Sequence, residues 1–143
     1  MSGAPLDRAW LAAHLPHQGS MSLLDAVASH DGETIHAIAT GHRAPGNPLR
    51  RAGELPVAAA IEYGAQAAAA HGALASGRPS GAGFLAAVRG VAFHAGRLDD
   101  VEADLDVHAA RIGGGDAGVI YRFEVLAAGR LLAAGRLTVA FAK

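Results

Sequence analysis

The sequence predicts an α+β domain in which a curved antiparallel sheet of about five to six strands wraps around one long central helix. Residues 56–75 have a helical pattern with apolar or small side chains on nearly every face, so other elements must enclose this helix. The segments that follow alternate apolar and polar residues, as strands do when one face of their sheet is in water. A sheet that curls around the helix satisfies both observations.

Composition places broad limits on the function. The chain has 143 residues, and we expect a single domain over residues 1–143. No apolar run approaches the roughly 20 residues of a membrane helix, and residues 1–10 lack the pattern of a secretion signal, which favours a cytoplasmic location. The chain has no cysteine, which excludes disulfides and thiolate chemistry. A net charge of −1 with scattered basic residues disfavours nucleic-acid binding.

The chain before the helix is expected to form short elements. In chain order these are a short helix over residues 6–14, a strand over residues 22–29, a strand over residues 34–40 and an irregular loop over residues 41–55. Pro16 ends the short helix, and the Asp31-Gly32 pair predicts a hairpin turn between the two strands. Three glycines and two prolines exclude regular structure from the loop, and a loop of this length is often functional.

The helix over residues 56–75 has the clearest local signals. Alanine is the strongest helix former, Pro56 stands where a helix tolerates proline, and Gly77 follows the last helical position. Four strands are expected after it in a meander-like succession, over residues 83–93, 101–111, 118–126 and 131–141. Glycine-containing segments at residues 113–116 and 128–129 predict the hairpin turns between the last three strands.

Three motifs stand in a fixed order between residues 15 and 85. They are Leu15-Pro16-His17 with Met21 and Leu23-Leu24-Asp25, then Leu55-Pro56 with Ile61-Glu62-Tyr63-x-Ala65-Gln66, and finally Gly83-Phe84-Leu85. In this order they resemble the 3-hydroxyacyl-ACP dehydratases of fatty-acid and polyene synthesis, which have the hot-dog fold. The likeness is closest to the divergent aryl-polyene-type dehydratases, because Pro48 stands where the housekeeping enzymes carry the histidine of a Gly-His-Phe-Pro motif.

The resemblance implies a lyase that removes water from a 3-hydroxyacyl chain on acyl carrier protein. This reaction takes a proton from C2 and protonates the departing C3 hydroxyl. Glu62 is the candidate acid, since burial on an apolar helix favours the protonated carboxyl. The resemblance points to His17 as the base, and His42, in a displaced Gly-His pair, is the alternative base.

The remaining site predictions concern substrate and partners. Backbone N–H groups around Val57 and Ala58, at the start of the helix, are expected to hold the thioester oxygen. Gln66, one turn after Glu62, is expected to support the site by hydrogen bonding. The resemblance implies a homodimer with active sites at the subunit junction. The loop arginines are candidates for contact with the acidic carrier protein, namely Arg43, Arg50 and Arg51.

Other interpretations of the same residues stay open. Glu62 also suits a thioesterase that activates water, or it only braces the fold. The absence of the Gly-His motif leaves open a non-catalytic acyl-binding or partner subunit. No metal or cofactor is expected, because a proline separates His14 from His17 and no metal-binding motif is present. His71 is expected to pack at a dimer contact. The other histidines on or beside strands are expected at the surface, namely His30, His36, His94 and His108.

Overall fold

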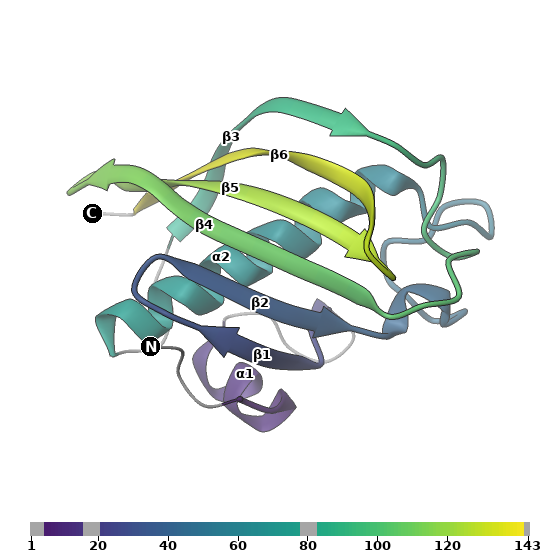
Figure 1. Ribbon diagram of the computed structural model, residues 1–143, viewed down its shortest axis with the longest axis horizontal. Coiled ribbons are helices and arrows are strands. Elements are labelled where there is room, and N and C mark those ends of the chain that lie inside the picture. The colour runs from purple at the N-terminus through teal and green to yellow at the C-terminus, as the bar shows by residue number, and fades with distance from the viewer. Residues whose placement is uncertain (1–4, 16–20, 78–82, 142–143) are drawn as a thin grey trace.

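The computed structural model describes residues 5–15, 21–77 and 83–141, and in these residues six strands form one sheet (Figure 1). The strands are β1 (Ala26–His30), β2 (Thr34–Ala39), β3 (Gly83–Phe93), β4 (Leu105–Gly115), β5 (Gly118–Ala127) and β6 (Arg130–Phe141). They lie in the order β1-β2-β4-β5-β6-β3, and every neighbouring pair is antiparallel. The predicted antiparallel sheet is confirmed.

The long helix α2 (Ala60–Ser76) lies along one face of the sheet, which is called the inner face from here on (Figure 1). A short 3-10 turn, η3 (Val57–Ala59), leads directly into it. Gly77 adopts the left-handed conformation, with φ of 70°, and ends the helix. The predicted helix is therefore present, and its first turn is wound more tightly than the rest.

Small side chains allow α2 to approach the sheet closely. Most of the buried positions of the helix are alanines, and Ile35, Val107 and Phe123 are buried on the inner face of the strands. Gly64 shows how close the approach is, because a Cβ atom there would lie 2.7 to 2.9 Å from three atoms of Phe123. The helix therefore sits where only a glycine backbone fits against the ring.

His71 fastens the second half of α2. Its Nε2–H donates to the carbonyl of Asp31 between β1 and β2 (3.0 Å), and its Nδ1 accepts from the hydroxyl of Tyr121 on β5 (2.7 Å). Burial lowers the pKa of His71 and raises the pKa of Tyr121 to about 12. The expectation that His71 packs at a dimer contact is wrong, because the ring is fully buried within its own chain.

The strand boundaries and the strand order differ in part from the sequence-based expectation. β4 begins at Leu105, because the preceding residues run beside the start of the helix, where Leu98 N–H donates to the carbonyl of Leu55 (2.8 Å). Residues 113–115, expected in a turn, extend β4, and the turn consists of residues 116–117. β3 pairs with β6, so only β4, β5 and β6 form a meander.

The remaining elements are short. Helix α1 (Arg8–His14) begins at Asp7, whose side chain accepts a hydrogen bond from the Trp10 N–H (2.9 Å). The loop before α2 is irregular as predicted, apart from one 3-10 turn, η2 (Gly41–Arg43). None of the helices in the described ranges has the length and apolar character needed to cross a membrane.

Candidate active site

Glu62 is the only acidic residue of α2 and lies in its first turn. The side chain is half-buried, and within the described residues no hydrogen bond or ion pair joins it to another group. A carboxylate that only braced the fold would be expected to have such a partner. This carboxyl group is therefore available for chemistry or for a ligand.

The start of the helix offers one free backbone donor. Three of its four amides already donate hydrogen bonds, namely those of Val57 (to Gly96, 3.2 Å), Ala59 (to Pro56, 3.0 Å) and Ala60 (to Val57 and Ala58). The N–H of Ala58 has no acceptor among the described residues, and Ala58 is exposed. Ala58 and Glu62 are four residues apart, so they lie on the same side of the helix. A free donor and a free acid thus lie about one helical turn apart.

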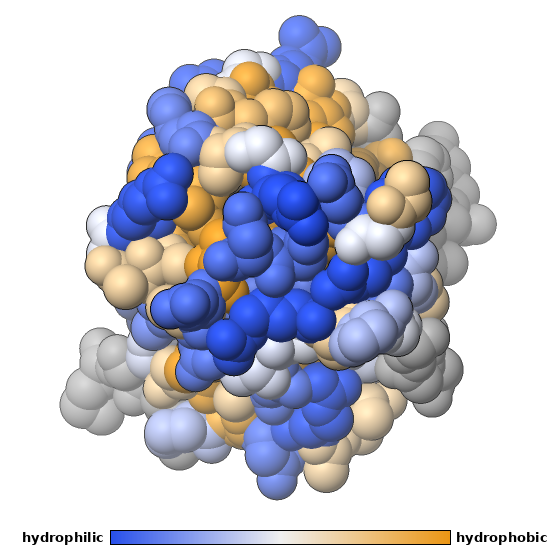
Figure 2. All heavy atoms as spheres, turned by 90° about the vertical axis from the view of Figure 1, so that its right-hand side faces the viewer, coloured by the Kyte–Doolittle hydropathy of each residue, from blue (hydrophilic) through white to orange (hydrophobic). Residues whose placement is uncertain are grey.

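The segment before η3 is held by the connection from β3 to β4. The carbonyl of Leu55 accepts from the Leu98 N–H (2.8 Å), and the N–H of Leu55 donates to Asp99 Oδ1 (2.8 Å). Arg97 pairs with Asp99 and with Glu54 (2.9 Å), and its hydrogen bonds hold the pKa of Asp99 well below the usual range. Figure 2 shows the hydrophilic residues gathered at this end of the molecule. These contacts fix the backbone from which the free N–H of the helix projects.

Gln66 ties α2 to the chain that enters β1. It is fully buried, its Oε1 accepts from the Leu23 N–H (2.9 Å), and its Nε2 donates to the carbonyl of Met21 (2.7 Å). The amide therefore orients the segment that follows the Leu15-Pro16-His17 motif. Because Gln66 is one turn from Glu62, this segment is fastened to the helix next to the free acid.

The two candidate bases have different surroundings. His17 lies outside the described residues. His42, in η2, is fully buried, and its Nε2 lies 2.9 Å from the carbonyl oxygen of Val101. Since a carbonyl only accepts, Nε2 carries the proton, and Nδ1 is an acceptor that no donor in the described residues reaches. A base must reach the substrate, but the imidazole of His42 is closed off from solvent by its own chain.

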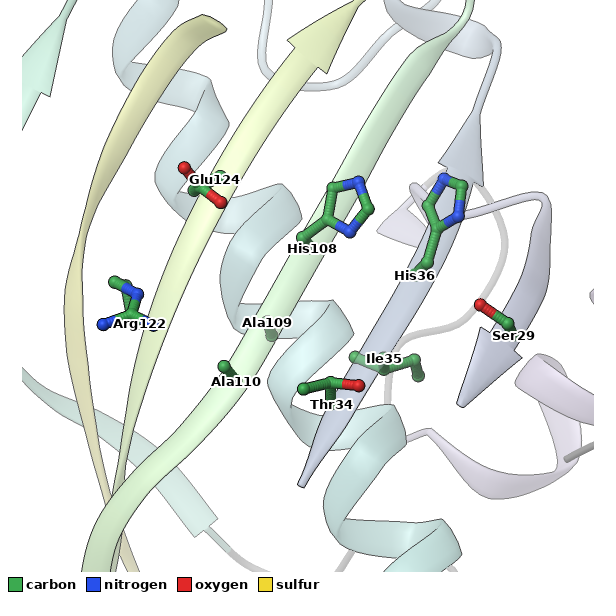
Figure 3. A pocket seen from close by; sticks show the side chains of 9 residues that line it. All are labelled: Ser29, Thr34, Ile35, His36, His108, Ala109, Ala110, Arg122 and Glu124. Carbon is green, nitrogen blue, oxygen red and sulfur yellow. The ribbon is translucent and has the colours of Figure 1, made fainter. Parts of the chain in front are cut away.

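A pocket that the sequence did not predict lies on the outer face of the sheet, opposite α2. Its volume is about 320 Å³, and Figure 3 shows the stacked rings of His36 on β2 and His108 on β4 at its edge, with centroids 4.3 Å apart. His36 Nε2 lies 2.8 Å from Asp106 Oδ1, while burial and the neighbouring His36 lower the pKa of His108. Within the described ranges, no group of three or more histidine, cysteine, aspartate or glutamate side chains is arranged to hold a metal ion.

The enclosed helix, the six-stranded sheet and the free acid on the first helical turn define the class as a hot-dog-fold protein. Residues 10–143 match the sequence model of the ApeP-like family, described as ApeP dehydratase, and the chain belongs to this family. The resemblance to polyene-type dehydratases inferred from the three motifs is confirmed. Among curated proteins, no sequence matches significantly.

Solved structures confirm the fold. The dehydratase heterocomplex ApeI:P from Xenorhabdus doucetiae contains a chain with a TM-score of 0.79 and 24% identity, over 93% of this chain and 91% of that one. AziG from S. sahachiroi matches with a TM-score of 0.60 and 18% identity, over 86% and 93% of the two chains. A mutant of the thioesterase PA1618 from Pseudomonas aeruginosa matches with a TM-score of 0.56 and 18% identity, over 80% and 78%. The same architecture therefore occurs in proteins with more than one described activity.

Proposed function

We propose that this protein eliminates water from a 3-hydroxyacyl thioester carried on acyl carrier protein, within a fatty-acid-like or aryl-polyene pathway. Membership of the ApeP-like dehydratase family supports the reaction class. The observation that carries the proposal is the unpaired Glu62 beside the free N–H of Ala58. A dehydratase needs an acid for the leaving hydroxyl and a donor for the thioester oxygen, and these two groups supply them.

The proposed reaction uses one base and one acid. The base removes a proton from C2, and the negative charge that develops on the thioester oxygen is stabilised by the N–H of Ala58. The electron pair from C2 forms the C2–C3 double bond while the C3–O bond breaks. Protonated Glu62 gives its proton to the departing hydroxyl, which leaves as water. The base gains one proton and the acid loses one, so the proton count balances.

We assign the base to His17, with His42 as the alternative. A base must touch the substrate, and the complete burial of His42 within its own chain argues against it. The position of His17 along the chain supports its assignment, because Met21, four residues later, is bonded to Gln66. Four residues span at most about 14 Å, so the chain is long enough for His17 to reach the start of α2.

The decisive experiment measures hydration of a 2-enoyl thioester by the purified protein. Glu62→Gln should lower the rate by at least about a hundredfold, the usual scale of general acid catalysis. Glu102→Gln, which changes an exposed glutamate of the β3–β4 connection, is the matched control. The same comparison of His17→Ala with His42→Ala identifies the base. Full activity of Glu62→Gln would remove this residue from the mechanism.

The second candidate activity is thioester hydrolysis, because the fold is similar to that of a thioesterase. In that reaction Glu62 would activate water to attack the thioester carbonyl and release the free thiol. Thiol release from a saturated acyl thioester, measured beside enoyl hydration, separates the two activities. Rapid thiol release without hydration would replace the dehydratase proposal.

We propose further that the active form is a homodimer joined at β3. β3 is an edge strand of the sheet, and it exposes two large apolar residues, Val88 (38%) and Phe93 (43%). An unpaired edge with exposed apolar side chains is a surface that another chain can extend. The solved ApeI:P structure is a dehydratase heterocomplex, so a second dehydratase chain is the alternative partner. Sedimentation of the purified chain at micromolar concentration should give a dimer, and a monomer would favour the second chain.

A further inference from the structure

Three arginines stand in one row across the outer face of the sheet. Arg122 on β5 pairs in register with Arg136 on β6, and Arg136 pairs in register with Arg89 on β3. All three side chains are exposed, and the neighbours of Arg122 along β5 are inward-facing and buried. Adjacent strands are about 4.8 Å apart, so the row, called the arginine row from here on, spans about 10 Å.

The arginine row is electrostatically unfavourable in the isolated chain. Like charges directly opposite each other on neighbouring strands repel and weaken a sheet. In the part of the chain that the structure describes, no carboxylate forms an ion pair with any of the three guanidinium groups. Glu124 is on the same face of β5, but its cross-strand partners are His108 and Ala134. A sheet that keeps three unpaired cations side by side is suited to an anionic partner.

We propose that the arginine row is the docking surface for an acidic helix of the carrier protein that delivers the acyl thioester. This inference rests on the proposed function. A helix advances about 1.5 Å per residue, so acidic residues three or four positions apart repeat every 4.5 to 6 Å. That repeat matches the strand spacing, and a helix lying across β5, β6 and β3 places one carboxylate opposite each arginine.

The surroundings of the row favour a protein partner. Ile120 and Thr138 form the adjacent cross-strand pair, and Ile120 is 38% exposed, which provides an apolar contact beside the charges. Glu124 and the overall charge of −1 disfavour a polyanion such as nucleic acid. The row ends on the edge strand β3, where the outer face of the sheet meets its rim. In the proposed dimer this edge is joined to the second chain, so the row lies next to the subunit junction, where the resemblance places the active sites.

The loop arginines, the earlier candidates for this contact, are mostly engaged elsewhere. The guanidinium of Arg50 donates to the carbonyls of Ala44 (3.0 Å), Gly53 (2.6 Å) and Arg43 (2.9 Å). Arg51 donates to the carbonyl of Arg50 (3.0 Å). These two residues brace the loop before α2, so the carrier contact moves from the loop to the sheet.

The test compares a carrier-bound substrate with a small one. The double variant Arg122→Glu/Arg136→Glu should lower kcat/KM for an enoyl chain on acidic, phosphopantetheine-bearing acyl carrier protein by about tenfold or more. Its turnover of the N-acetylcysteamine thioester of the same chain should be unchanged. Added salt should slow the native protein with the carrier-bound substrate and have little effect on the double variant. The neutral variant Arg122→Gln/Arg136→Gln should give a smaller loss in the same direction, which excludes a folding defect of the charge reversal.

Arg130→Glu is the matched control, because Arg130 is an exposed arginine of the same sheet outside the arginine row. Its kcat/KM for both substrates should equal that of the native protein. Unchanged turnover of the carrier-bound substrate by the row variants, an equal loss caused by Arg130→Glu, or a loss caused by Arg43→Glu instead would overturn the proposal. Affinity for the carrier protein itself is measured in parallel by fluorescence anisotropy. If the native protein turns over neither substrate, the proposed function fails, and the loss or retention of carrier binding in the row variants still decides the docking surface.

Discussion

Replacing Gly64 by alanine tests how closely α2 is seated against the sheet. The added Cβ would lie 2.7 to 2.9 Å from Cγ, Cδ2 and Cβ of Phe123, which are atoms at the base of a fully buried side chain. The ring cannot swing away, so the helix must shift. Overpacking of this kind costs about 1–3 kcal/mol, and the better helix propensity of alanine offsets about 1 kcal/mol. We expect Gly64→Ala to lower the free energy of unfolding by up to about 2 kcal/mol.

Gly72→Ala is the matched control on the same helix. A Cβ at Gly72 meets nothing within 4 Å, so only the propensity gain remains, and this variant should be more stable by up to about 1 kcal/mol. Urea unfolding followed by far-ultraviolet circular dichroism measures both changes. Gly64→Ala should cost less stability when it is introduced into the Phe123→Leu variant than when it is introduced into the native protein, since the two sites are in contact. Equal stability of the two glycine variants would refute the close approach of helix and ring.

Two further predictions concern the buried polar groups of α2. Burial lowers the pKa of His71 in the folded chain, whereas the unfolded value is about 6.5. Below about pH 6.5 the unfolded state therefore binds a proton that the folded state lacks, and stability falls as the pH falls. His71→Gln keeps both hydrogen-bonding functions and should flatten this decline by up to about 1.4 kcal/mol per pH unit in urea titrations, while parallel curves would contradict the assignment. Gln66→Leu leaves the Leu23 N–H and the Met21 carbonyl unpaired and should cost about 1–3 kcal/mol for each buried group. It should also lower kcat for enoyl hydration, and a variant with native kcat would show that the tether serves stability alone.

The helix and most of the strands are predictable from the sequence because their signals are local. Alanine content and Gly77 define α2, and alternation of apolar and polar residues defines β5 and β6. The strand order is not local, since the pairing of β3 with β6 joins Arg89 to Arg136, which are 47 positions apart in the sequence. The start of β4 was misplaced because Val101 continues the alternation, although its N–H is bonded to the Leu98 carbonyl (3.0 Å) in the preceding turn.

The candidate site shows the same division between local and long-range information. Glu62 stands out in the sequence because it is a lone acid on an apolar helix, which is a local exception. His42 in η2 contacts the distant residue Val101, and its burial cannot be predicted from local sequence. The sequence alone therefore does not decide whether His17 or His42 is the base. The stacking of His36 and His108 and the arginine row exist only through cross-strand register. The available signal was that these residues occupy outward positions of strands, which by itself indicates only a polar face.

The contrast between two carboxylates explains how this fold prepares a site at the start of α2. Asp99 is fixed by Arg97 and by the N–H of Leu55, so its carboxylate holds the chain that enters the helix. Glu62 has no such partner in the described residues, although it lies only one turn beyond the free N–H of Ala58. A rigid backbone with an unengaged donor and acid lowers the reorganisation needed when charge develops on a bound thioester. We therefore propose that the clamp at Asp99 and the tether at Gln66 prepare the start of α2 for acid–base chemistry.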